Sequence, residues 1–149
     1  VGVVPMIRQF ATEKRQVNLA ISLHAANDAL RSKLLPINRR YPLQDLMQAC
    51  RDYVSMTNRR LSFEWALIQG VNDSPTDARE LASLVKGLLC HVNIIPLNPT
   101  TEYDGKPTTR ENAEAFKNIL ESSGVPCTIR LRRGIDIRAG CGQLASKHQ

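Results

Sequence analysis

Apolar residues along this chain gather in four short runs that predict β-strands. Each run is bounded by polar residues, glycine or proline, and none is long enough to read as a helix. The four runs are residues 17–24, 61–68, 90–95 and 126–132. From Leu61 to Leu67 the large apolar residues occupy every second position, which is the spacing of a strand with one face in a core.

The segments between these runs have apolar residues at the spacing of an α-helix. Apolar residues from Leu43 to Val54 form one stripe, and similar stripes fall at 78–88 and 113–120. A short helix is also expected up to Leu35, because Pro36 stops it. The predicted helix caps are Asn27, Ser74 and Thr108, the last two in capping boxes completed by Asp77 and Glu111.

This alternation predicts an α/β fold with about four βα units. Strands separated by helices need crossover connections, so we expect parallel strands. Four strands cannot close a barrel. The chain is therefore either a small open sheet or the C-terminal portion of a larger, partial (β/α) barrel.

Composition narrows the class of protein. The chain has 149 residues, of which 42% are hydrophobic, and no apolar run approaches the roughly 20 residues of a membrane span. It begins at Val1 in what reads as mid-domain sequence, so we expect a piece of a longer protein. A net charge of +6 favours an anionic partner such as nucleic acid. The four cysteines are scattered without a Cys-x-x-Cys pair, which favours a reducing, cytoplasmic location and predicts no metal site in this chain.

Polar side chains follow the predicted strands on what should be one rim. Ligands of parallel α/β folds bind at the carboxyl ends of strands. Ser22 and His24 end the first run, and Asn98 follows the third between two prolines. His24 is equally explained as a partner of the next helix, and Asn98 as a turn residue. We interpret Asn72 and Asp73, after the second run, as turn and pre-cap residues.

Glu64 is harder to explain by packing alone. It lies in the middle of an otherwise apolar strand. An unpaired carboxylate is costly to bury, so this side chain must face a polar lumen or a partner.

Cys141 lies in a basic, glycine-flanked segment that predicts chemistry. Nearby positive charge favours the thiolate, which is the nucleophilic form. The surrounding arginines are Arg130, Arg132, Arg133 and Arg138. They are candidates for RNA binding through phosphate groups. The alternatives are an ordinary loop cysteine and a solvated basic edge.

Three segments together resemble a known family. They are Ser-Leu-His-Ala at 22–25, Asn-Ile-Ile-Pro-Leu-Asn-Pro at 93–99, and residues 132–144, which end in Cys141-Gly-Gln-Leu144. The chain resembles the C-terminal half of the radical S-adenosylmethionine RNA adenine-C2 methyltransferases (RlmN/Cfr type). The resemblance implies a radical-SAM partial barrel, with residues 1–149 as its C-terminal part.

The resemblance also implies roles for individual residues. Ser22, Leu23, His24 and Asn98 would line the S-adenosylmethionine site. Cys141 would carry the methyl group as an S-methylcysteine intermediate. A radical generated at a [4Fe-4S] cluster would then drive transfer to carbon-2 of an adenine in large-subunit rRNA and in tRNA.

Several parts that the family needs are absent from these residues. The Cys-x-x-x-Cys-x-x-Cys cluster motif, the N-terminal helical domain and the first strands of the barrel do not occur in the chain. We therefore expect it to be inactive alone, within a monomeric cytoplasmic enzyme that needs an electron donor and no membrane. The alternatives are a basic RNA-binding module without catalysis and another radical-SAM enzyme.

Overall fold

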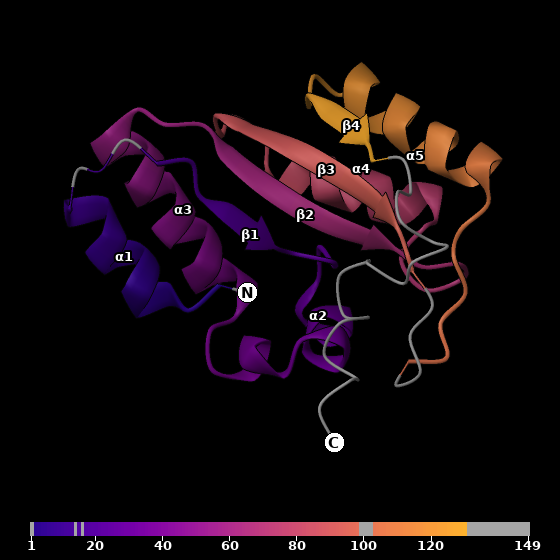
Figure 1. Cartoon of the computed structure of the whole chain (residues 1–149), viewed down its shortest axis with the longest axis horizontal. Coiled ribbons are helices and arrows are strands. Elements are labelled where there is room, and N and C mark those ends of the chain that lie inside the picture. The colour runs from indigo at the N-terminus through magenta and orange to yellow at the C-terminus, as the bar shows by residue number, and fades with distance from the viewer. Residues whose placement is uncertain (1, 14, 16, 99–102, 131–149) are drawn as a thin grey trace, which may run out of the picture.

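A computed structural model describes residues 2–13, 15, 17–98 and 103–130. Its centre is a single four-stranded sheet in the order β1-β2-β3-β4, with every neighbouring pair parallel (Figure 1). The strands are β1 (Ala20–Ser22), β2 (Leu61–Leu67), β3 (Cys90–Pro96) and β4 (Cys127–Ile129). The predicted α/β architecture with about four βα units is confirmed.

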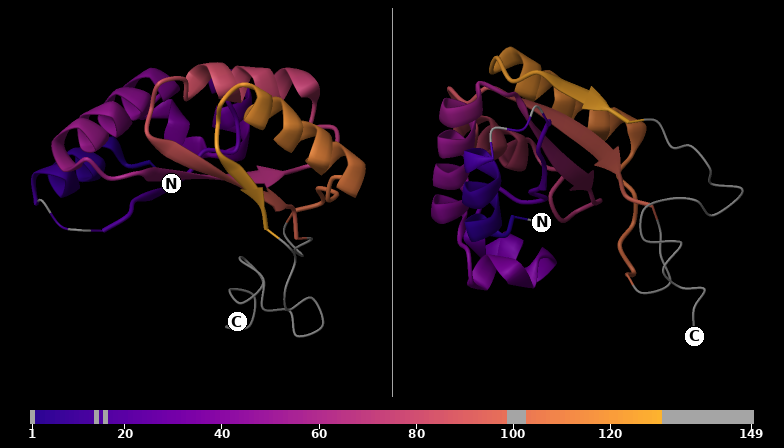
Figure 2. Two further views of the ribbon diagram at one scale, coloured as in Figure 1. Left: turned by 90° about the horizontal axis from the view of Figure 1, so that it is seen from above. Right: turned by 60° about the vertical axis from the view of Figure 1, so that its left-hand side comes forward.

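Helices connect the strands and cover one face of the sheet. They are α1 (Val4–Thr12), α2 (Asp28–Leu34), the short 3-10 helix η1 (Pro36–Arg39), α3 (Leu43–Thr57), α4 (Pro75–Leu84) and α5 (Arg110–Ser122). Seen from above, α3, α4 and α5 lie along the same side of the sheet (Figure 2). The opposite face has no helix over it among the described residues. No helix in this part of the chain is both long and apolar enough to cross a membrane.

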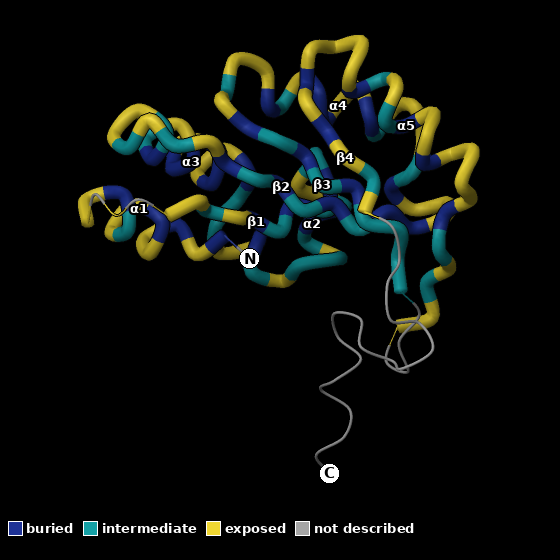
Figure 3. Tube along the Cα trace, turned by 45° about the horizontal axis from the view of Figure 1, so that its top comes forward, coloured by how far each residue is buried: buried dark blue, intermediate teal, exposed yellow. Residues whose placement is uncertain are grey.

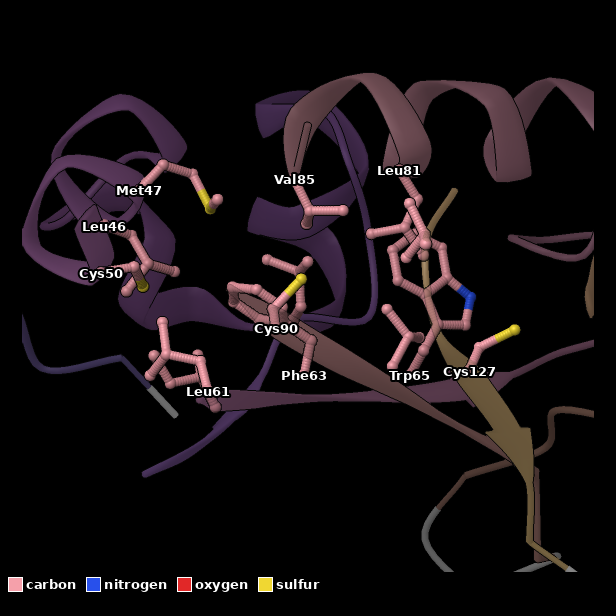
Figure 4. Close-up of a cluster of buried hydrophobic side chains, with 14 of the residues drawn as sticks. Leu46, Met47, Cys50, Leu61, Phe63, Trp65, Leu81, Val85, Cys90 and Cys127 are labelled. Atoms are coloured by element: carbon pink, nitrogen blue, oxygen red, sulfur yellow. The ribbon is translucent and has the colours of Figure 1, made fainter. Parts of the chain in front are cut away.

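The core lies between the sheet and these helices. Along β2 and β3, buried positions alternate with half-buried ones (Figure 3). The buried positions of β2 include Phe63 and Trp65, and the Trp65 ring packs 5.7 Å from the ring of Phe116 on α5. Figure 4 shows Phe63 and Trp65 on the same side of the sheet as Leu81 of α4 and Val85. Cys90 belongs to this core, where burial raises the pKa of its thiol to about 11, so it is unreactive near neutral pH.

The capping signals position the helices, with one correction. Asn27 caps α2 by accepting a hydrogen bond from the backbone N–H of Leu30 at 2.9 Å, and Ser74 forms the predicted capping box with Asp77. The predicted cap at Thr108 is wrong. Thr109 caps α5, because the Thr108 hydroxyl donates instead to the carboxylate of Asp73 at 2.7 Å.

Two further elements differ from expectation. The first strand is shorter than the predicted run 17–24, because Ala20 already pairs with Ser62 and β2 begins at Leu61, which leaves no β2 residue opposite Val17 and Asn18. The Val17 carbonyl accepts instead from the Tyr53 hydroxyl at 2.7 Å. Helix α1, which the sequence pattern did not predict, packs its buried side chains into the same core.

Asn72 fastens the end of β1 to the end of β2, so the interpretation of it as a turn residue is incomplete. Its side chain has no exposed surface. The amide nitrogen donates to the carbonyl oxygens of His24 at 2.8 Å and Ala66 at 2.7 Å. The amide oxygen accepts from the backbone N–H of Ile68 at 2.7 Å, and the Asn72 carbonyl accepts from the Trp65 indole at 3.3 Å.

We expect Asn72→Ala to lower the free energy of unfolding by about 2–4 kcal/mol. The substitution leaves two carbonyl oxygens and one N–H of the strand ends without these partners. Urea unfolding followed by circular dichroism measures the loss. The matched control is Asn112→Ala at an exposed position on α5, which should change stability by about 0.5 kcal/mol or less. Equal stability of the two variants would contradict the role of Asn72.

Candidate functional site

The described site residues predicted from the sequence lie at the carboxyl edge of the sheet. Ser22 is the last residue of β1, and Leu23 and His24 follow directly. Asn98 lies two residues beyond the end of β3, on the same edge. Leu23 is fully buried in the core, and its N–H donates to the Glu64 carbonyl at 3.0 Å, so it supports the turn from below.

The predicted methyl carrier and most of the basic cluster lie outside the described residues. These are Cys141, Arg132, Arg133 and Arg138. Arg130 is described: it is exposed, directly follows β4, and donates its backbone N–H to the Ile94 carbonyl at 2.8 Å.

A fully buried arginine holds the turn after β1. The Arg31 side chain has no exposed surface. Its Nε donates to the Leu23 carbonyl and its Nη2 to the Ser22 carbonyl, both at 3.2 Å. Burial lowers the pKa of Arg31, and the charge of nearby Asp28 opposes that effect. The guanidinium therefore fixes the direction of two consecutive carbonyl groups at the candidate site.

Asn38 links the Arg31 guanidinium to the Asp28 carboxylate by hydrogen bonds. Nη1 of Arg31 donates to Oδ1 of buried Asn38 at 2.8 Å, and Nδ2 of Asn38 donates to the Asp28 carboxylate at 2.8 Å. The same carboxylate oxygen accepts the backbone N–H of Leu43, at the start of α3, at 2.8 Å. This chain of hydrogen bonds ties the turn to two helices. Arg31 and Asn38 were not among the predicted site residues, because nothing in their spacing along the sequence distinguishes them from surface residues.

His24 is a neutral hydrogen-bond donor at this turn. Its backbone is left-handed, with φ of 59°, a conformation uncommon outside glycine. Its Nδ1 accepts the backbone N–H of Ala66 at 2.9 Å, so the ring proton lies on Nε2. Burial, together with the charge of Arg31, lowers the pKa of His24 to about 4. At neutral pH the imidazole therefore offers one N–H to a ligand.

A row of polar residues crosses the face of the sheet that has no helix over it. Ser22, Glu64, Asn93 and Thr128 are successive partners in the strand register. Asn93 donates to the Glu64 carboxylate at 2.7 Å. His91, one layer lower, lies 2.8 Å from the Thr128 hydroxyl. Hydrogen-bonding groups here suit a polar organic ligand with several donors and acceptors.

The described residues do not suit a metal cluster. Among them, no group of three histidine, cysteine, aspartate or glutamate side chains is placed to hold a metal ion. Cys50, Cys90 and Cys127 are buried, and burial raises the pKa of each thiol, to about 12 for Cys50 and about 11 for the other two. Thiolates are the form that binds iron, so these three cysteines are poor ligands.

We expect the 149-residue chain to lose stability between pH 6.5 and pH 4 through His24. Its folded pKa of about 4 lies below the ordinary 6.5, so in this range the unfolded chain takes up a proton that the folded chain refuses. The loss is about 2–3 kcal/mol by pH 4 and absent above pH 7.

His24→Asn is the matched variant, since asparagine tolerates a left-handed backbone and its Oδ1 can accept from Ala66 without titrating. Unfolding free energies of both chains at pH 7 and pH 4 give the difference. Parallel pH profiles for the two would contradict the assignment.

Comparisons with known proteins support the family suggested by the sequence. No family model matches the chain. A probable dual-specificity RNA methyltransferase RlmN from Caldanaerobacter subterraneus subsp. tengcongensis is 54% identical over 148 residues, which are 99% of this chain and 43% of that protein. The dual-specificity RNA methyltransferase RlmN 1 of Myxococcus xanthus is 54% identical over 144 residues, 97% of this chain and 40% of that protein.

Solved structures agree with the fold. A radical SAM methyltransferase from Sphaerobacter thermophilus superposes with a TM-score of 0.93 at 55% identity, covering 95% of this chain and 42% of that one. A domain of pyruvate-formate lyase-activating enzyme from Bacteroides vulgatus has a TM-score of 0.62 at 14% identity, a likeness of fold alone.

The chain thus spans less than half the length of the curated relatives that it matches. Identity above one half extends over nearly all of its own residues, and the neighbouring structure of similar sequence shares its fold closely. Nearly all of this chain is therefore similar, in sequence and in fold, to a part of the RlmN-type radical SAM RNA methyltransferases.

Proposed function

We propose that this chain forms the S-adenosylmethionine-binding and methyl-carrying part of an enzyme that methylates carbon-2 of adenine in rRNA and tRNA. The observation that supports this most is the polar, in-register row on the face of the sheet without helices, in a chain more than half identical to RlmN proteins. A row of this kind does nothing for the core, but it fits a ligand with several donors and acceptors.

In this proposal the turn after β1 binds the cofactor. Ser22 offers a hydroxyl, His24 offers its Nε2–H, and Asn98 offers an amide from the neighbouring strand end. Leu23 stays in the core and, with Arg31, keeps the turn in place. A [4Fe-4S] cluster, with ligands outside the described residues, would supply the single electron that radical chemistry needs.

Cys141 would receive the methyl group first. The Cys141 thiol would first lose its proton to solvent. The thiolate would then attack the methyl carbon of S-adenosylmethionine, so that a carbon–sulfur bond to Cys141 would form, the methyl–sulfonium bond would break and S-adenosylhomocysteine would leave. A carrier is needed because carbon-2 of adenine is electrophilic and does not displace a sulfonium methyl as a nucleophile would.

RNA would approach the same rim over the arginines. Arg130 is exposed there and lines a groove of about 760 Å³ between α5 and β4, in which Arg110, Lys117 and Arg130 outnumber the one carboxylate, Glu114. Cations along a groove suit phosphate groups. Arg132, Arg133 and Arg138 would extend this basic surface toward Cys141. We place the whole enzyme in the cytoplasm, as a monomer served by an electron donor.

Cys141→Ala in the full-length protein that contains this chain should lower methyl transfer by about a thousandfold or more, because no other group replaces the carrier. RNA affinity should stay within about twofold. Mass spectrometry of 2-methyladenosine measures the product, and the peptide that holds Cys141 in the wild type should gain about 14 Da, one CH₂.

Cys90→Ala is the matched control, since Cys90 lies in the core (Figure 4) at the first position of β3, the end of the strand away from the candidate site. It should leave methyl transfer nearly unchanged. Normal product from Cys141→Ala would overturn the carrier role. If the wild type binds RNA but transfers no methyl group, the result would favour a binding module instead.

A further inference from the structure

Glu64 is the charged residue that the fold itself does not explain. It occupies the central position of β2, with Phe63 and Trp65 on either side completely buried in the core. Its own side chain lies on the opposite face and is half-buried. A carboxylate at this depth loses part of its hydration, and a threonine or valine would suit a strand better.

Asn93 on β3 holds one oxygen of this carboxylate. The two residues are register partners, and Nδ2 of Asn93 donates to Oε1 of Glu64 at 2.7 Å. A carboxylate only accepts hydrogen bonds, so the amide must turn its nitrogen toward Glu64 and its oxygen away. Oε1 of Glu64 is therefore engaged, while Oε2 accepts no hydrogen bond from the described residues.

The charge of Glu64 is not neutralised by an ion pair within the described part of the chain. The two ion pairs formed there join Arg15 to Glu13 and Lys117 to Glu121. The field of Glu64 reaches His91 one layer below, where it raises a pKa that burial and Arg60 lower. A negative carboxylate thus lies on a surface that is polar but holds no partner cation for it in these residues.

Glu64 is also the direct neighbour of the candidate cofactor turn. Ser22 is its register partner on β1, on the same face. The Glu64 carbonyl accepts the N–H of Leu23 at 3.0 Å, so a shift of either residue moves the other. A ligand that touches the Ser22 hydroxyl therefore lies within reach of the Glu64 carboxylate.

We infer that the Glu64–Asn93 pair positions the ribose of S-adenosylmethionine, with the Glu64 carboxylate accepting hydrogen bonds from the ribose hydroxyl groups. This inference rests on the proposed function. A vicinal diol carries two adjacent O–H donors, and the two oxygens of one carboxylate are adjacent acceptors with lone pairs for both. Asn93 orients the carboxylate and does not need to touch the ligand.

The test measures binding of S-adenosylhomocysteine and its 2′-deoxy and 3′-deoxy forms to the full-length protein that contains this chain, by titration calorimetry. Glu64→Gln should weaken binding of S-adenosylhomocysteine by about tenfold or more, because a hydrogen bond to a charged acceptor is lost. At least one deoxy form should bind the wild type more weakly by a similar factor. That deoxy form should bind wild type and Glu64→Gln about equally. It lacks the hydroxyl group that would donate to the Glu64 carboxylate, so the substitution removes no further hydrogen bond.

Glu80→Gln is the matched control. Glu80 also accepts from an asparagine, Asn27, at 3.1 Å, but on the helical side of the molecule, and the substitution should leave all affinities unchanged. Asn93→Ala should weaken binding by a smaller factor than Glu64→Gln. Circular dichroism of each variant shows that the fold is intact.

The outcomes separate the two proposals. Equal affinity of wild type and Glu64→Gln for S-adenosylhomocysteine overturns the inference while the cofactor site stands. If removing either ribose hydroxyl weakens binding equally in wild type and in Glu64→Gln, the ribose contact is overturned. Glu64 then accepts from another donor of the ligand. Absence of binding by the wild type, with its cluster reconstituted, overturns the proposed function itself.

Discussion

The buried guanidinium of Arg31 is the interaction on which the geometry of the candidate site depends. A fully buried cation is tolerated only where hydrogen bonds replace its water. Here these bonds go to the carbonyls of Ser22 and Leu23 and, through Asn38, to the Asp28 carboxylate. If the turn after β1 moved, the Arg31 guanidinium would either become exposed or stay buried without its hydrogen bonds. This constrains the turn more strongly than packing alone.

Asn72 secures the same turn from the other side. It binds the His24 carbonyl that follows the two carbonyls held by Arg31. Three consecutive carbonyls, of Ser22, Leu23 and His24, are thus fixed by side chains from two different loops or helices. This explains how His24 keeps a left-handed backbone, a strained conformation for a non-glycine residue that persists when its surroundings determine it. The result is a rigid edge, which suits a site that orients a ligand.

Much of this arrangement could be predicted from the sequence, and the reasons for the rest are physical. Alternation along β2 and the capping signals at Asn27 and Ser74 are local, so they identify strands and helices without a partner. The roles of Arg31 and Asn72 are not local. Each binds carbonyls whose positions exist only after the strands pair, and in sequence each looks like a surface or turn residue. Thr108 failed as a cap for the same reason, because Asp73, distant along the chain, takes its hydroxyl.

The two faces of the sheet have different roles: one forms the core, and the other carries the polar groups proposed to bind a ligand. The face toward the helices is apolar without interruption in β2, and it contributes the stability that the chain has available. The other face carries Ser22, Glu64 and Asn93 in one row, where apolar residues would pack better against a covering layer. Natural sequences break local rules of this kind mainly at functional sites. Glu64 places a carboxylate in the middle of a strand, with Asn93 to orient it and its own carbonyl bonded to the turn after β1. Such a group is best understood as one kept for a ligand.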